Sequence, residues 1–124
     1  MQYIDTVYLN LNHFTKIPQL LWQNPNLPKS FSNLSANDLG KILNVFTKAL
    51  GKSTNGQAHN ITVSPIILDG TPCMKVDFDE INTHSVSYVF MKNNNLISFD
   101  YIYNHKDVDK ANPLITHSVN SIKL

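Results

Sequence analysis

Residues 35–51 read S-A-N-D-L-G-K-I-L-N-V-F-T-K-A-L-G, and this stretch decides the fold. Its apolar residues recur at intervals of three, four and seven, which places them on one face of an α-helix: Leu39, Ile42, Leu43, Phe46, Ala49 and Leu50. Ser35 and Asp38 have the spacing of a capping box, and Gly51 stands where many helices end in a left-handed residue. We therefore predict an amphipathic helix whose apolar face, with Phe46 at its centre, packs on a sheet.

The sheet is expected from the second half of the chain. Runs in which β-branched and aromatic residues alternate with other residues predict half-buried antiparallel strands over 61–68, 74–80, 85–91 and 96–103. Pro65 assigns the first of these strands to an edge or a bulge, because proline cannot donate to a ladder of hydrogen bonds. Asp69-Gly70 and the asparagines at 93–95 are typical of turns.

The two ends of the chain are less sharply patterned. Residues 3–14 fit both a helical stripe and a strand alternation, and we favour a helix because the stripe covers more positions. Near the C-terminus we expect a polar loop over 104–113 and a short closing strand over 115–122. The predicted fold is one α+β domain over residues 1–124, with N-terminal helices packed on a curved antiparallel sheet of about four strands.

Composition excludes several classes of function. The chain has 124 residues and a net charge of +1, and all ten of its basic residues are lysines. Without arginine there is no bidentate fork for phosphate or guanine, so we expect no nucleic-acid partner. No apolar run approaches the ~18 residues of a membrane span, and the N-terminus lacks the pattern of a signal peptide. We expect a soluble cytoplasmic protein; the alternative is a periplasmic protein whose signal has been removed.

Residues that commonly carry chemistry are scattered. The five histidines show no metal-ligand spacing and are interpreted as surface or loop residues: His13, His59, His84, His105 and His117. Cys73 is the single cysteine, so no disulfide forms within the chain, and its place at a strand start indicates a structural role. We predict no metal site, no cofactor and no catalytic residue.

An acidic group on the second predicted strand is the candidate binding site. Asp77 and Asp79 share one face of the strand, with Lys75 beside them and Glu80 following. One interpretation is a solvated sheet face, and another is a recognition surface for a basic partner protein. A third is a pair of catalytic carboxylates, which is disfavoured because no nearby residue completes an acid–base constellation.

An aromatic set also has two interpretations. In one interpretation the whole set packs in the core: Trp22, Tyr88, Phe90, Phe99, Tyr101 and Tyr103. In the other, Trp22, Tyr88, Tyr101 and Tyr103 line a pocket in which the tyrosine hydroxyls supply polar groups.

Three phrases resemble the nuclear-transport-factor-2-like (cystatin-like) superfamily across residues 15–103. They are S-F-S-x-L-S-A-x-D-L at 30–39, A-L-G-K at 49–52, and K-V-D-F-D at 75–79 followed by an aromatic run at 99–103. The resemblance implies a curved sheet wrapped around helices to form a cone-shaped pocket. Its members include isomerases, dehydratases, binding proteins and assembly modules, and the acid–base aspartate and tyrosine of its isomerases have no counterparts here.

Two functional hypotheses follow from these observations. The first is a small bacterial, non-enzymatic binding protein that engages another protein, either as an immunity protein or inhibitor covering a basic toxin or as an assembly module. The alternative is a small-molecule-binding or isomerase-like pocket protein of the cone-shaped type. The sequence also leaves a homodimer open.

Overall fold

The structure, a computed structural model, describes residues 2–4, 7–9, 15–16, 30–92 and 95–124. Its elements follow one another in this order: β1 (Gln2–Ile4), β2 (Val7–Leu9), β3 (Thr15–Lys16), α2 (Ala36–Ser53), β4 (His59–Leu68), β5 (Thr71–Asp79), β6 (Thr83–Lys92), β7 (Asn95–Asn104), the 3-10 turn η1 (His105–Asp107) and α3 (Val108–Asn120).

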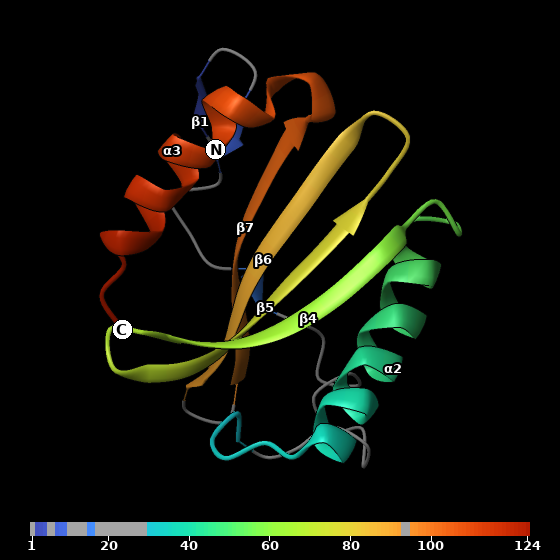
Figure 1. The fold of residues 1–124 in the computed structure, drawn as a ribbon, viewed down its shortest axis with the longest axis vertical. Coiled ribbons are helices and arrows are strands. Elements are labelled where there is room, and N and C mark those ends of the chain that lie inside the picture. Colours follow the sequence, from blue (N-terminus) through green and yellow to red (C-terminus); the bar gives the residue numbers. More distant parts are fainter. Residues whose placement is uncertain (1, 5–6, 10–14, 17–29, 93–94) are drawn as a thin grey trace.

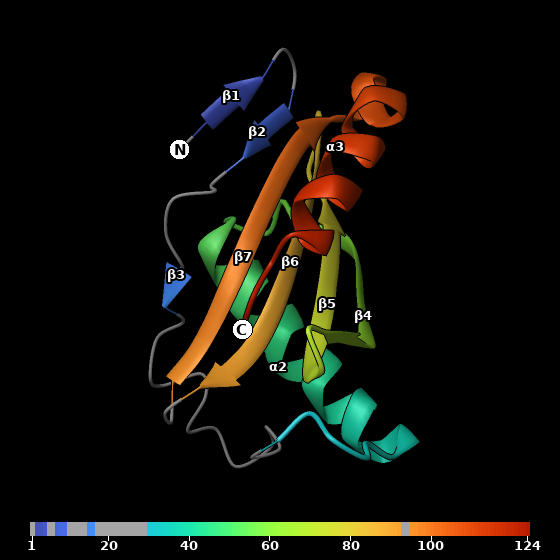
Figure 2. The same ribbon diagram turned by 90° about the vertical axis from the view of Figure 1, so that its left-hand side faces the viewer.

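The predicted α+β class is confirmed, because a helix precedes a four-stranded antiparallel meander. Strands β4, β5, β6 and β7 are neighbours in that order, β2 and β1 extend the sheet beyond β7, and the two-residue β3 also pairs with β7. The sheet is open, with β1 and β4 at its ends. Helix α2 lies against one face and helix α3 against the other (Figures 1 and 2).

Helix α2 begins as predicted and ends later than predicted. The Asp38 backbone N–H donates to Ser35 Oγ at 3.1 Å, and the Ser35 backbone N–H donates to Asp38 Oδ2 at 3.0 Å, which completes the capping box. These bonds lower the pKa of Asp38. Gly51 does not terminate the helix, contrary to the prediction. The chain turns left-handed only at Asn55 and Gly56, after Thr54 Oγ1 has donated to a carbonyl of the last turn.

The face under α2 forms an apolar core. Ile42 and Phe46 of the helix pack with alternate residues of the central strands, and the buried members of this cluster are Phe31, Ile42, Val45, Phe46, Met74, Val76 and Val89. Phe46 is 5% exposed, which confirms its predicted burial against the sheet. The helical stripe and the strand alternation therefore meet as the sequence indicates.

Two predictions for the C-terminal residues are wrong, because these residues form a helix on the second face of the sheet. Residues 104–113 and 115–122 were expected to form a loop and a strand, but helix α3 occupies most of both segments. Its buried residues, Ala111, Ile115 and Val119, recur every four positions and pack on Val86, Tyr88, Tyr101 and Tyr103. Burial of this narrow stripe outweighs Pro113, which lies inside the helix and removes one backbone donor.

The N-terminal prediction is also wrong for the residues described. The favoured helix over 3–14 is replaced by strands β1 and β2, which pair antiparallel, and β2 continues onto β7 with Leu9 opposite Tyr101. The physical reason is the edge of β7, whose backbone N–H and C=O groups gain partners from an added strand.

The predicted strands and their edge are confirmed. Three of the four runs lie within β4, β6 and β7, the run 74–80 extends one residue beyond the end of β5, and β4 ends the sheet, as Pro65 indicated. The register of β4 shifts near Asn60, whose φ is 53°. Asp69 and Gly70 both have positive φ, as a two-residue hairpin turn requires.

Candidate functional site

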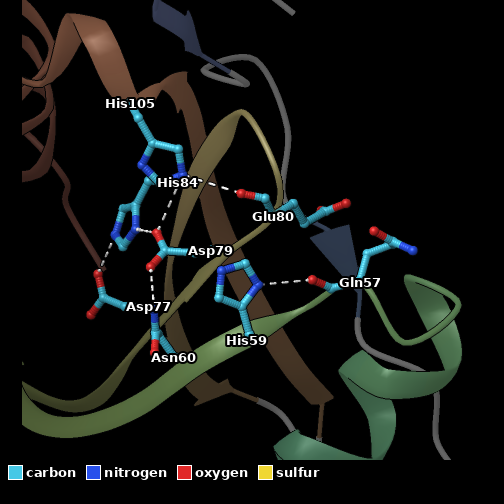
Figure 3. A network of polar contacts seen from close by, with 8 residues as sticks. All are labelled: Gln57, His59, Asn60, Asp77, Asp79, Glu80, His84 and His105. Atoms are coloured by element: carbon cyan, nitrogen blue, oxygen red, sulfur yellow. Dashed lines mark hydrogen bonds and ion pairs between the residues drawn. The ribbon is translucent and has the colours of Figure 1, made fainter.

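A polar cluster lies on the α3 face, at the end of the sheet where β5 turns into β6 (Figure 3). At its centre, His84 Nδ1 contacts Asp79 Oδ1 at 2.7 Å and His84 Nε2 contacts Asp77 Oδ1 at 3.0 Å. All three side chains are between 20% and 23% exposed. Both nitrogens of one imidazole are therefore held by carboxylates at a half-buried position.

The strand register creates this cluster. Asp79 is directly opposite His84 across the β5–β6 ladder, and Asp77 is opposite Val86, one diagonal step away on the same face. The prediction that Asp77 and Asp79 share a face is confirmed. Sequence analysis missed His84 because its role depends on the length of the turn between the strands, although counting outward from that turn would have paired it with Asp79.

Hydrogen bonds from several side chains converge on the Asp79 carboxylate. Because a carboxylate only accepts, the donor in its contact with His84 is a ring N–H. Asn60 Nδ2 donates to Asp79 Oδ2 at 3.1 Å, and His105 Nε2 lies 3.8 Å from Asp79 Oδ1. The hydrogen bond from His84 is the main reason that the pKa of Asp79 is lowered; burial opposes it and Asn60 adds to it.

The predicted tyrosines lie under α3 beside this cluster. Tyr88, Tyr101 and Tyr103 are buried, and the Tyr103 ring centroid is 5.4 Å from that of His84. Burial, with Asp77 nearby, raises the pKa of Tyr88 to about 12. The Tyr101 hydroxyl is hydrogen-bonded to Ser118 Oγ of α3 at 3.0 Å. Trp22, the fourth member of the predicted pocket, lies outside the described residues, and the pocket stays a prediction.

The 3-10 turn η1 packs against the β5–β6 turn and completes this end of the molecule. The His105 backbone N–H donates to the Asn82 carbonyl at 3.1 Å, and His105 Nε2 contacts the Glu80 carbonyl at 3.1 Å. The Glu80 side chain points away from His84 (Figure 3). Ile81 in the turn is 82% exposed, and Val108 at the start of α3 is 38% exposed.

We call this region the hairpin-end surface and define it by Asp77, Asp79, Glu80, Ile81 and Val108. It joins all three predicted partner-binding residues to two of the three large exposed hydrophobic residues found in the described part of the chain. The third, Ile67, lies on β4 near the β4–β5 turn.

The described residues contain no group of three histidine, cysteine, aspartate or glutamate side chains placed to hold a metal ion. Cys73 is buried, and this burial raises the pKa of its thiol, which disfavours the reactive thiolate. No helix in the described ranges is both long and apolar enough to cross a membrane.

Comparisons of the chain with protein-family models, curated proteins and solved structures found no match. The site is therefore interpreted from its own geometry and charge.

Proposed function

We propose that this is a non-enzymatic binding protein that engages another protein through the hairpin-end surface. The observation that carries the proposal is Ile81, which is 82% exposed at the tip of the β5–β6 turn and directly follows the acidic group. Apolar side chains in contact with a partner release water and supply binding energy, and polar groups around them set specificity. Ile81 is the proposed apolar anchor, with carboxylates as its rim.

Charge indicates the kind of partner. The chain as a whole carries +1, but five carboxylates and three lysines belong to this end: Asp77, Asp79, Glu80, Asp107, Asp109, Lys75, Lys106 and Lys110. A local acidic field on a nearly neutral protein steers a basic surface toward it. The partner we propose is a protein with a basic rim around an apolar recess, such as a basic toxin covered by its inhibitor or a basic assembly component.

The hydrogen bonds of the cluster support binding over turnover. His84 has both ring nitrogens engaged, so neither is free to move a substrate proton. Asn60 and His84 fix the Asp79 carboxylate before any partner arrives, which reduces the entropy lost on binding.

The second candidate function is a small-molecule or isomerase-like pocket, as the superfamily resemblance implies. It is favoured by one observation, the packing of the Tyr103 ring beside His84 and its two carboxylates. A ligand in such a pocket would have to displace either the α3 side chains over the tyrosines or one carboxylate from His84, which makes it the weaker candidate.

The test is affinity capture from an extract of the source organism with three immobilised proteins: the natural chain, Ile81→Glu and Ile67→Glu. The two substitutions place the same charge at two highly exposed isoleucines, at 82% and 72%, so folding is affected little in either. We expect the natural chain and Ile67→Glu to retain the same basic protein at high occupancy and Ile81→Glu to lose it.

The proposal would be contradicted if the natural chain and Ile81→Glu captured the same proteins, or if neither captured any. A protein captured equally by all three would assign binding to another surface. Retention of a small molecule that survives Ile81→Glu, detected by mass spectrometry of the purified chain, would favour the pocket.

A further inference from the structure

Strand β4 is a sheet edge without the usual protection by charge. It is the last strand of the sheet, at the edge opposite β1 (Figure 2). Its ten residues, H-N-I-T-V-S-P-I-I-L, include no lysine, aspartate or glutamate. Edge strands offer unpaired backbone groups to other chains, and charged side chains commonly prevent such pairing.

The hairpin turn determines which backbone groups of β4 face outward. Positive φ at both Asp69 and Gly70 identifies a type I′ turn, whose flanking pair, Leu68 with Thr71, is the hydrogen-bonded kind. Pair types alternate along an antiparallel ladder, so Ile67, Pro65 and Val63 direct their backbone groups away from β5. Pro65 agrees with this assignment, because its missing N–H costs nothing at an outward position.

The side chains of these outward residues are apolar and share the α2 face. Val63 packs with the α2 cluster, and Ile61, Pro65 and Ile67 share its face by alternation. Ile67 is 72% exposed, since the contacts of α2 do not cover it. No strand among the described residues pairs with the outer side of β4, so this edge combines outward backbone groups with a row of apolar side chains.

We propose that β4 pairs antiparallel with β4 of a second copy of this chain, about a two-fold axis at Ser64. In this register Val63 lies opposite the partner's Pro65, and Ile61 lies opposite the partner's Ile67. The Val63 N–H donates to the carbonyl of the partner's Pro65, and each Ile61–Ile67 pair exchanges two backbone bonds. Every pair on the α2 face is then apolar with apolar.

Features of the strand select this occupant and this register. An uncharged strand meets its own copy without repulsion, and isologous pairing is the commonest way in which proteins form dimers. The bulge at Asn60 and the turn at Asp69 limit the usable strand to 61–67. A two-fold axis at Ile66 would place Val63 opposite the partner's turn, and an axis at Thr62 would place Pro65 opposite the partner's bulge. Either register would lose backbone hydrogen bonds. One paired edge is a small interface, so we expect a dimer with a Kd of roughly 10–100 µM.

The first test uses Ser64→Cys, because residues on the axis form a non-hydrogen-bonded pair with Cα atoms about 4.5 Å apart, within disulfide reach. The matched control is Thr62→Cys, which is on the same exposed face but far from its own copy in this register. Cys73 is fully buried and adds no background. We expect mild oxidation at ~100 µM to link Ser64→Cys into dimers at least tenfold faster than Thr62→Cys; equal rates would overturn the proposal.

The second test is analytical ultracentrifugation at chain concentrations up to ~1 mM. We expect the natural chain and Ile81→Lys to shift from 14.0 kDa toward twice that mass, and Ile67→Lys to remain at 14.0 kDa. A natural chain that is monomeric at ~1 mM, or an Ile67→Lys variant that dimerises like the natural chain, would also overturn it. Because Ile81→Lys removes only the proposed partner surface, failure here is distinguishable from failure of the proposed function.

Discussion

Helix α2 covers its face of the sheet with apolar side chains along its length, whereas α3 covers the opposite face only in part. Beneath α2 the strands contribute Met74, Val76 and Val89. Beneath α3 they contribute mainly tyrosines, and at the β5–β6 end the same face carries Asp77, Asp79 and His84 at the margin of the helix. Away from the β4 edge, where Ile67 is exposed, the first face is closed by packing, and the second leaves a polar end in contact with solvent.

This difference separates structural from functional surface within one small sheet. Where a face is closed by apolar contacts, as the α2 face is away from the β4 edge, its side chains contribute chiefly to stability. On the α3 face, hydrogen bonds hold an ordered, partly exposed histidine and two carboxylates that the apolar core does not require. Substitutions on the two faces test this contrast, and we expect the largest effect on the α2 face.

Truncating the side chain at the centre of the α2 face should lower the free energy of unfolding the most. Phe46→Ala deletes a ring that is 5% exposed and leaves a cavity, so we expect the free energy of unfolding to fall by about 3–5 kcal/mol. Urea denaturation measures this loss. Lys48→Ala, at an exposed position of the same helix, is the control and should change stability by less than about 0.5 kcal/mol. A loss below about 1 kcal/mol for Phe46→Ala would show that α2 does not close this face.

Truncating a buried side chain in the middle of the α3 face should lower the free energy of unfolding by a smaller amount. Ile115→Ala removes a smaller buried side chain from a shorter helix that contains a proline, and we expect a loss of about 2–3 kcal/mol in the same assay. His117→Ala, at an exposed position of α3, is the control. An unchanged stability would mean that α3 is not docked on the tyrosines.

The carboxylates of Asp77 and Asp79 should make a modest contribution to the free energy of unfolding. The sequence alone predicts no stability change when Asp77 and Asp79 both become asparagine, because exposed charges contribute little. The structure revises that expectation, since the double change removes both charged acceptors of His84. We expect a loss of about 1 kcal/mol at pH 7, and a similar loss for His84→Gln. Combining all three substitutions should cost far less than the sum of the two losses; full additivity would show that the groups do not interact.

Acid should weaken this contribution. The folded-state pKa of Asp79 is lowered, so its bonds stabilise the fold above the unfolded pKa of about 4 and this stability is lost as pH falls through the folded value. Thermal midpoints measured between pH 2 and pH 6 should therefore fall less steeply for Asp79→Asn than for the natural chain. Parallel curves below pH 4 would contradict the assigned shift.

The parts of the fold that sequence predicts are those set by local periodicity. The capping box at Ser35 and the alternation of the four long strands depend on residues within a few positions of one another. The C-terminal helix was missed because its stripe of Ala111, Ile115 and Val119 is narrow and contains a proline. The strand β2 was missed because its pairing with β7 is a contact between opposite ends of the chain.

The candidate site was predicted only in part, for the same reason. Asp77 and Asp79 share a face through alternation within one strand, which the sequence shows directly. His84 joins them through register across a turn, and a shift of one residue would place it on the other face. Ile81 lies between the predicted strands 74–80 and 85–91, and its exposure was not predicted, because the packing of η1 beside this turn is a contact between distant residues.

The measurement that tests the functional contrast most directly is site-specific photo-crosslinking in an extract of the source organism. A photoreactive amino acid would replace Ile81 in one protein and Thr116, an exposed residue of α3 outside the hairpin-end surface, in another. We predict one discrete adduct with a basic protein from position 81, weakened at high salt, and none from position 116. Equal adducts from both positions, or an adduct from position 116 alone, would contradict the assignment of the hairpin-end surface as the partner-binding site.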